Sequence, residues 1–285
     1  MAALLAGSFP SLKQQVGNSH QSVSGHPPAQ PVPLQDIEQL ARRLFAGRQG
    51  RDKVISRVQG LWSEAAGKDF LVIHSPGGWG NSKWDSLLDW EKSIVTGVTA
   101  TLEKLGYSAV IVQYFRSGDT WIGHMRDVLK EAQFFFWGRS ARAQVMAEEL
   151  RFIVQRKEGL RIVLTGASQG AAFDNAVMQK LGGLERVYSI ELGTFFPHMK
   201  RRTVTPRTLA IDSNGLMRDP MCQRDLWAGT RSYIKAFYRW FKYKLQGKPV
   251  KFTHCINTPG HEYLWEYPAV HTNIAEFLAA QFGAK

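Results

Sequence analysis

A serine between two glycines carries the clearest chemical signal in this chain of 285 residues. Residues 166–170 have the spacing G-x-S-x-G, with Ser168 at the centre. This spacing is typical of a sharp strand-to-helix turn that exposes a serine hydroxyl as a nucleophile, because glycine has no Cβ to crowd the turn. An ordinary glycine-rich turn is the alternative interpretation, so the flanking residues must decide between the two.

The residues on either side of Ser168 favour the nucleophile. The apolar run 160–164 predicts a strand, and apolar residues at helical spacing over 171–181 predict a helix that ends at Gly182. The N-terminus of such a helix favours the negative charge that develops on a tetrahedral intermediate. We therefore predict that Ser168 attacks an acyl carbon.

The predicted nucleophile needs a base, and the base needs an orienting acid, because a serine hydroxyl is weakly nucleophilic near neutral pH. Functional groups of parallel α/β sheets lie beyond the carboxyl ends of the strands. His261, in the loop before the last predicted helix, is the predicted base, with a solvated loop histidine as the alternative. We expect its Nε2 within hydrogen-bond reach of Ser168, and its Nδ1 held by Asp219 from the loop after the penultimate predicted strand. The alternative acids are Asp212 and Glu191.

An oxyanion hole would complete the site, and it requires backbone N–H groups aimed at one point. One donor is expected from Gln169, the residue after the nucleophile. The second is expected from Gly77 or Gly78, in the loop after the first predicted strand. A phosphate-binding glycine loop is the alternative, but the G-K-S/T sequence of a P-loop is absent there.

The elements that must position these residues alternate along the chain. Alternating strands and helices predict an α/β fold with a mostly parallel sheet flanked by helices. Residues 1–33, rich in Ser, Gly, Gln and Pro, predict a disordered arm, and residues 34–285 a single domain. The predicted strands are 69–74, 107–114, 160–164, 186–192, 207–211 and 250–256. The predicted helices include 36–62, 86–105 and 268–282, and residues 120–155 predict one broken helix or two.

Composition limits the partners. The net charge of +12 favours anionic surfaces such as lipid headgroups, nucleic acid or acidic substrates, but no nucleic-acid-binding motif is present, so we expect no specific nucleic acid. Cys222 and Cys255 form neither a disulfide framework nor a metal-ligand pattern. We expect a cytoplasmic protein without a metal or another cofactor.

Over roughly residues 69–282 the chain resembles the α/β-hydrolase superfamily, in particular its serine esterases and lipases. The shared features are the glycine loop 74–80, the G-x-S-x-G turn, an acidic loop at Asp219 and the Gly260-His261 pair, in the order Ser, Asp, His. The resemblance implies an α/β-hydrolase-like domain and a serine hydrolase that acts on a small-molecule ester or acyl substrate. Residues 193–206 depart from it, because they are poorly helical where the family has a crossing helix.

Three functions fit this sequence. The leading one is hydrolysis of a carboxylic ester or thioester through an acyl-enzyme on Ser168. An acyltransferase would use the same triad, and a non-catalytic protein of this fold would bind a membrane or other anionic partners instead.

A basic aromatic helix, residues 231–245, lies between the acidic loop and the histidine loop. Its apolar residues fall along one face, so two arrangements are open: a crossover helix packed on the sheet, or a peripheral contact with an anionic membrane. The apolar residues are Ile234, Phe237, Tyr238, Phe241 and Leu245, and the basic ones include Lys235, Arg239, Lys242 and Lys244.

Overall fold

The computed structural model describes residues 32–78, 80, 82–116, 134, 138, 140–247, 255 and 258–283. The predicted disordered arm, residues 1–33, lies outside the described residues except for its last two. The chain divides into two compact units, residues 1–67 and 68–285. This boundary falls inside the single domain expected over residues 34–285, which stays a prediction.

The first unit contains two helices, α1 (Leu34–Leu44) and α2 (Arg48–Glu64), where the sequence predicted one. The break falls at Phe45, whose φ of −140° and ψ of 128° are extended. Each helix buries one apolar face, as expected for helices that pack in a core. The buried side chains are Ile37, Leu40 and Ala41 in α1, and Val54, Val58, Leu61 and Trp62 in α2.

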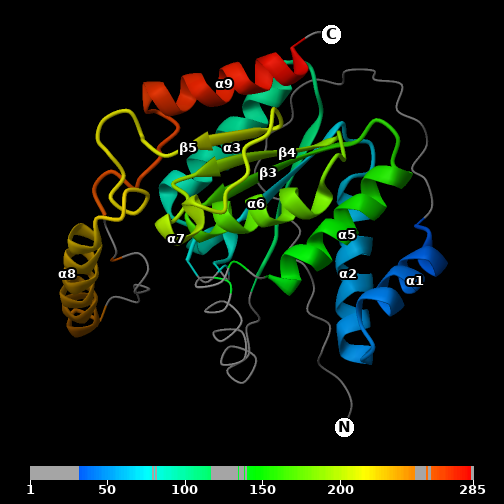
Figure 1. Ribbon diagram of the computed structural model, residues 1–285, viewed down its shortest axis with the longest axis horizontal. Coiled ribbons are helices and arrows are strands. Elements are labelled where there is room, and N and C mark those ends of the chain that lie inside the picture. Colours follow the sequence, from blue (N-terminus) through cyan, green and yellow to red (C-terminus); the bar gives the residue numbers. More distant parts are fainter. Residues whose placement is uncertain are drawn as a thin grey trace. The chain divides into compact units, whose positions relative to one another are not determined.

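The second unit is built on a five-stranded, wholly parallel sheet with the strand order β2-β1-β3-β4-β5 (Figure 1). The three central strands are buried along almost their whole length, which explains their nearly continuous apolar runs. The predicted fold class, α/β with a mostly parallel sheet flanked by helices, is therefore confirmed. The strands are β1 (Phe70–Ser75), β2 (Ala109–Gln113), β3 (Arg161–Ala167), β4 (Val187–Leu192) and β5 (Thr208–Ile211).

Helices cover both faces of this sheet (Figure 1). On one face α3 (Asp89–Lys104) and α9 (Pro268–Phe282) share a core with alternate residues of β1 such as Phe70 and Val72. On the other face lie α5 (Ala141–Arg156) and α6 (Gln169–Leu181). Because the sheet is parallel, all its strands end at one edge, where the loops carrying the predicted site residues begin.

The connections between these elements differ in part from the prediction. Two short helices, η1 (Trp84–Ser86) and α7 (Phe196–Met199), occur in loops, and α7 confirms that residues 193–206 are poorly helical. Most of the predicted strand 250–256 lies outside the described residues, and Cys255, its described member, is in a 3-10 conformation.

The basic aromatic helix is α8 (Leu226–Leu245), five residues longer at its start than predicted. Its apolar face is exposed rather than packed on the sheet, with Ile234 64% and Leu245 75% exposed. None of the helices in the described part of the chain is long and apolar enough to cross a membrane.

Candidate active site

Ser168 occupies a strained turn between β3 and α6. Its backbone has φ 53° and ψ −111°, a conformation that costs free energy for a residue with a Cβ. The Ser168 N–H donates to the Leu192 carbonyl at 2.8 Å, at the carboxyl end of the neighbouring strand β4. Strained backbone of this kind persists only where surrounding structure fixes it, as at functional sites.

The two glycines of the motif are required by close backbone approaches. A Cβ on Gly166 would lie 2.6 Å from the Ala171 backbone nitrogen, and one on Gly170 would lie 2.0 Å from the Ser75 carbonyl oxygen. Both distances are far inside van der Waals contact. The turn itself therefore explains why glycines stand on both sides of Ser168. This agrees with the interpretation of the motif as a turn that presents a nucleophile.

His261 and Asp219 meet at the same edge of the sheet. The Nδ1 of His261 lies 2.7 Å from Oδ2 of Asp219, which is completely buried, while the His261 side chain is 15% exposed. Gly193, the residue after Leu192, packs against both, because a Cβ there would lie 2.9 Å from His261 Cε1 and from Asp219 Oδ2. The chain thus brings the Ser168 turn, through Leu192 and Gly193, to the imidazole of His261.

The expected hydrogen bond between Ser168 Oγ and His261 Nε2 does not occur among the contacts of the described residues. Catalytic hydrogen bonds are often long without substrate and tighten when it binds. The structure therefore brings together the acid and the base, and places the serine turn beside them.

The Asp219 carboxylate is held ionised by its surroundings. Burial raises its pKa, but the hydrogen bond and charge of His261, with hydrogen bonds from Tyr263 and Cys222, outweigh burial and lower the pKa below its ordinary value. The Tyr263 hydroxyl donates at 2.6 Å and the Cys222 thiol at 3.2 Å. Burial raises the pKa of both donors, so they stay protonated, and an ionised Asp219 fixes the Nδ1–H tautomer of His261.

The two alternative acids are engaged elsewhere. Asp212 forms a two-pronged ion pair with Arg202, at 2.7 and 2.5 Å. Glu191 accepts hydrogen bonds from Asn175 at 2.9 Å and Ser189 at 3.1 Å. Of the three candidate acids, the structure brings Asp219 to His261.

The N–H groups predicted to form the oxyanion hole differ in whether they already have a hydrogen-bond acceptor. Gln169 is the first residue of α6, where backbone N–H groups have no acceptor within the helix. Gly77 was expected as an open donor, but its N–H donates to Oε1 of Glu91 at 2.8 Å, so a carboxylate occupies it. Gly78, with φ 55°, is the other candidate in that loop, and the roles of Gln169 and Gly78 stay predictions.

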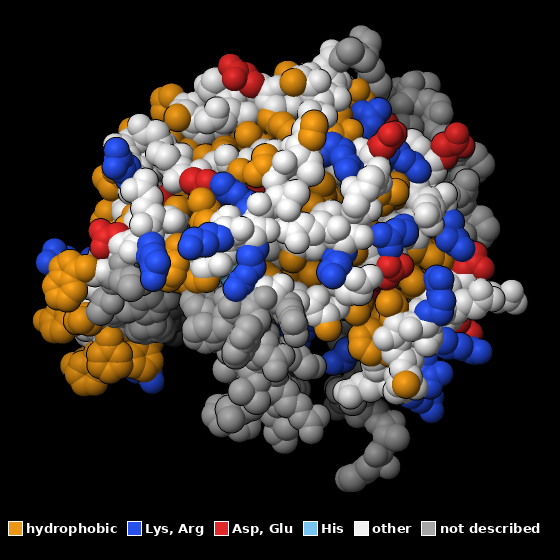
Figure 2. All heavy atoms as spheres, in the orientation of Figure 1, with side chains coloured by type: hydrophobic (Ala, Val, Ile, Leu, Met, Phe, Trp, Pro, Cys, Tyr) orange, Lys and Arg blue, Asp and Glu red, His pale blue; other side chains and the backbone are white. Residues whose placement is uncertain are grey.

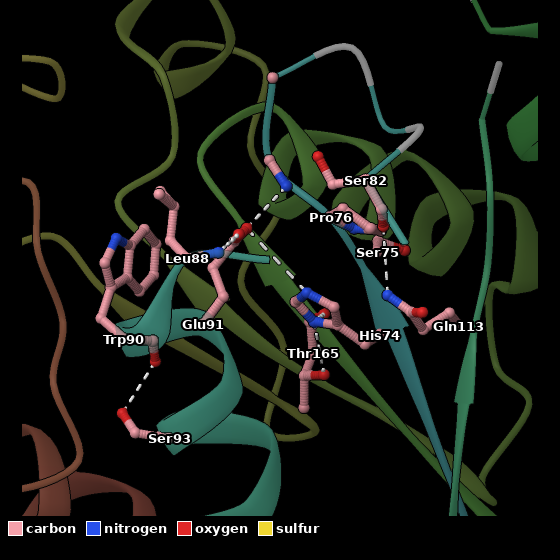
Figure 3. A network of polar contacts seen from close by, with 12 residues as sticks. His74, Ser75, Pro76, Ser82, Leu88, Trp90, Glu91, Ser93, Gln113 and Thr165 are labelled. Atoms are coloured by element: carbon pink, nitrogen blue, oxygen red, sulfur yellow. Dashed lines mark hydrogen bonds and ion pairs between the residues drawn. The ribbon is translucent and has the colours of Figure 1, made fainter. Parts of the chain in front are cut away.

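Glu91, which the sequence did not single out, ties the glycine loop to the start of α3 (Figure 3). It also accepts from Leu88 N at 3.4 Å, and its Oε1 lies 4.0 Å from Nε2 of His74. Burial raises the pKa of Glu91 and lowers that of His74 to about 4, so His74 is neutral and its Nδ1–H donates to the Thr165 carbonyl at 2.9 Å. The position of the Gly77 N–H therefore depends on a buried polar network.

Arg116 and Asp174 fix the same loop through other atoms. The guanidinium of Arg116, only 1% exposed, donates to the carbonyls of Pro76 at 2.9 Å and Gly78 at 2.7 Å. Asp174 accepts from the Ser75 hydroxyl at 2.5 Å, and burial raises the pKa of Asp174 well above its ordinary value. No sequence signal indicated these roles, because most arginines and aspartates are exposed.

Comparisons with known proteins leave the family open. No protein-family model matches the chain, and no curated protein matches it. Among solved structures, a Trichoderma reesei cutinase in complex with a C11Y4 phosphonate inhibitor is similar at a TM-score of 0.39 and 12% identity, over 86% of this chain and 89% of that chain. This likeness is too weak to support a function, which rests on the site alone. In the described part of the chain, no group of three or more His, Cys, Asp or Glu side chains could hold a metal ion.

Proposed function

We propose that the protein is a serine hydrolase that cleaves a carboxylic ester or thioester through an acyl-enzyme on Ser168. The observation that carries the proposal is the buried Asp219 carboxylate on Nδ1 of His261, beside the strained turn that presents Ser168. A buried acid that orients a histidine next to a serine in such a turn is the arrangement that activates a hydroxyl nucleophile.

In the first half of the reaction, Ser168 Oγ attacks the substrate carbonyl carbon while His261 Nε2 takes the hydroxyl proton. The tetrahedral intermediate then collapses, the bond to the leaving alcohol or thiol breaks, and His261 returns the proton to that group. In the second half, water attacks the acyl-enzyme and gives its proton to His261. The carboxylic acid leaves as Ser168 regains its proton, so the enzyme is unchanged after each turnover.

Asp219 acts through His261. Its negative charge stabilises the imidazolium that forms when His261 takes the proton, and its hydrogen bond keeps Nε2 directed away from the acid. The hydrogen bonds from Tyr263 and Cys222 to the same carboxylate oxygen hold Asp219 in place during this transfer.

The negative charge on the substrate oxygen falls at the N-terminus of α6. The Gln169 N–H and the positive end of the α6 dipole stabilise that charge. Because Glu91 occupies the Gly77 N–H, the second donor is the Gly78 N–H, and Arg116 fixes this residue by donating to its carbonyl.

A panel of p-nitrophenyl esters from acetyl to palmitoyl tests this proposal and defines the preferred acyl length. Ser168→Ala should abolish turnover of every ester that the wild type hydrolyses, and the exposed Ser63→Ala in α2 is the matched control. Ester cleavage that is unchanged in Ser168→Ala would overturn the proposal. Addition of alcohol acceptors to the same assay separates hydrolysis from acyl transfer, because transfer yields a new ester instead of the free acid.

A further inference from the structure

We propose that α8 docks the protein on an anionic phospholipid surface, with its exposed apolar stripe inserted between the headgroups. The proposal goes beyond ester hydrolysis, and it stands on the exposure of α8 and on the charges that border the stripe. We define the α8 stripe by six exposed side chains: Trp227, Ile234, Phe237, Tyr238, Phe241 and Leu245.

The six side chains of the α8 stripe lie on one face of the helix. With 3.6 residues per turn, its six members fall within about a third of the helix circumference. Their exposed fractions run from 52% to 72% for the aromatic members and from 64% to 75% for Ile234 and Leu245. Figure 2 shows hydrophobic side chains gathered over α8, at the lower left of the view. Soluble proteins rarely expose so many large apolar side chains on one helix face without a partner.

The side of α8 opposite the stripe carries buried side chains. Ser232 and Ala236, which are 5% and 0% exposed, lie on the side of α8 that faces away from the stripe. The Arg239 guanidinium donates to the Cys255 carbonyl at 3.4 Å, also away from the stripe. The stripe is therefore directed outward, and a flat surface can approach it.

Positive charge borders the stripe. Arg231, Lys235 and Lys242 are exposed along one side of it and Lys244 along the other, and Arg239 lies farther round the helix beyond Lys235. Residues 226–245 contain no acidic residue, and the whole chain carries a net charge of +12. Lys235, Arg239 and Lys242 lie close together along this open face of α8, where headgroup phosphates would lie.

This combination specifies a lipid surface rather than another anion. A helix with an apolar face and flanking cations binds the interface of an anionic bilayer, because the apolar side chains leave water and the cations meet phosphates. Nucleic acid would use the cations but would gain little from a broad apolar stripe that contains aliphatic side chains. Charge and apolar exposure on the same helix therefore favour the bilayer.

Vesicle sedimentation with the full chain tests the proposal, using phosphatidylglycerol–phosphatidylcholine vesicles and pure phosphatidylcholine vesicles at two salt concentrations. Three variants are compared. In the stripe variant, Ile234, Phe237 and Phe241 are replaced by Ser. In the basic variant, Lys235, Arg239, Lys242 and Lys244 are replaced by Gln. In the charge-matched control, Arg42, Arg43, Arg48 and Lys53, all exposed in the first unit, are replaced by Gln.

We expect the wild type to bind the anionic vesicles and to bind the neutral ones at least about tenfold more weakly. The stripe and basic variants should each lose at least about tenfold in partition onto anionic vesicles, whereas the charge-matched control should lose less than about threefold. Salt should weaken wild-type binding more than that of the basic variant. Hydrolysis of a small soluble ester and the circular dichroism spectrum should be unchanged in all three.

Three results would overturn the proposal. Equal binding by the wild type and the stripe variant would show that the apolar stripe does not insert into the bilayer. An equal loss in the basic variant and the charge-matched control would assign binding to net charge rather than to α8. Tighter binding to random-sequence duplex DNA than to the anionic vesicles, lost in the basic variant and kept in the stripe variant, would identify α8 as a nucleic-acid surface.

Discussion

The Asp219 carboxylate and the His261 imidazole, 42 positions apart in the chain, share a hydrogen bond of 2.7 Å between Oδ2 and Nδ1. The loop of Asp219 and the loop of His261 are joined by a second contact, from the Asn214 side-chain amide to the Glu262 carbonyl at 3.0 Å. Gly260, with φ 92°, lets the two backbones approach, because a Cβ there would lie 2.4 Å from the Arg218 carbonyl oxygen. The pair is thus held by contacts between two loops of the fold.

Asp219→Asn should lower kcat by about 10³- to 10⁴-fold, because an amide at this position no longer holds the Nδ1–H tautomer of His261. Asp212→Asn is the matched control in the same region and should keep turnover within a few-fold of wild type, because Asp212 pairs with Arg202. Steady-state kinetics on the best ester of the panel measures both. A larger loss in Asp212→Asn than in Asp219→Asn would reassign the acid.

Gly170→Ala should destabilise the protein by about 3 kcal/mol and reduce turnover, because a backbone oxygen of Ser75 occupies the space of the new methyl group. Gly183→Ala is the control, since an added Cβ there has no neighbour within 4 Å. Urea unfolding gives the difference in free energy. Equal stability of the two variants would show that β1 and the Ser168 turn are not in close contact.

Glu191 should make the protein less stable as the pH rises from its unfolded pKa to its folded one. Burial raises the folded pKa from 4.5 to about 7, so between these values the folded chain binds a proton that the unfolded chain has lost. Stability is therefore highest below the lower value and falls by about 3 kcal/mol up to the higher one. Glu191→Gln should remove this fall in the free energy of unfolding, measured by urea unfolding at several pH values. Its turnover should stay within a few-fold of the wild-type value. An unchanged slope in Glu191→Gln would exclude this titration.

Much of the second unit could be predicted from the sequence, for a definite reason. Buried parallel strands read as short apolar runs, so β1, β3 and β4 were located to within three residues at either end. The glycines around Ser168 indicated the turn because close backbone approach leaves no alternative residue. The sequence pattern was sufficient to predict those parts of the structure that are determined by steric contacts between nearby residues.

The remaining features depend on contacts between distant segments, which local pattern does not contain. Glu91 and Arg116 are buried where they contact the glycine loop, whereas a charged residue in a sequence normally indicates exposure to solvent. The Gly77 N–H looked free because its acceptor lies 14 positions away, in another element. The pattern of α8 showed an apolar face but not which side of the helix the protein would cover.

Arg116→Lys should lower kcat by about 10- to 100-fold with KM nearly unchanged, because a lysine ammonium does not take the position of the rigid guanidinium nitrogen Nη2, which donates to both carbonyls, and the loop then shifts. Arg186→Lys is the matched control. Arg186 also donates to backbone carbonyls, including that of Lys157 at 2.8 Å, but it precedes the amino end of β4, at the opposite edge of the sheet. An equal fall in kcat in Arg116→Lys and Arg186→Lys would show a general loss of rigidity. It would contradict a role of Arg116 in positioning the glycine loop.

Covalent labelling with a fluorophosphonate, followed by peptide mass spectrometry, tests the central claim most directly. The reagent reacts with a serine only when a base activates the hydroxyl, so it reports the function of Ser168, His261 and Asp219 without knowledge of the substrate. We expect one label, on the peptide that contains Ser168, absent in Ser168→Ala and slowed at least about 10³-fold in His261→Ala. Labelling that persists in Ser168→Ala, or a wild-type protein that is never labelled, would contradict the account.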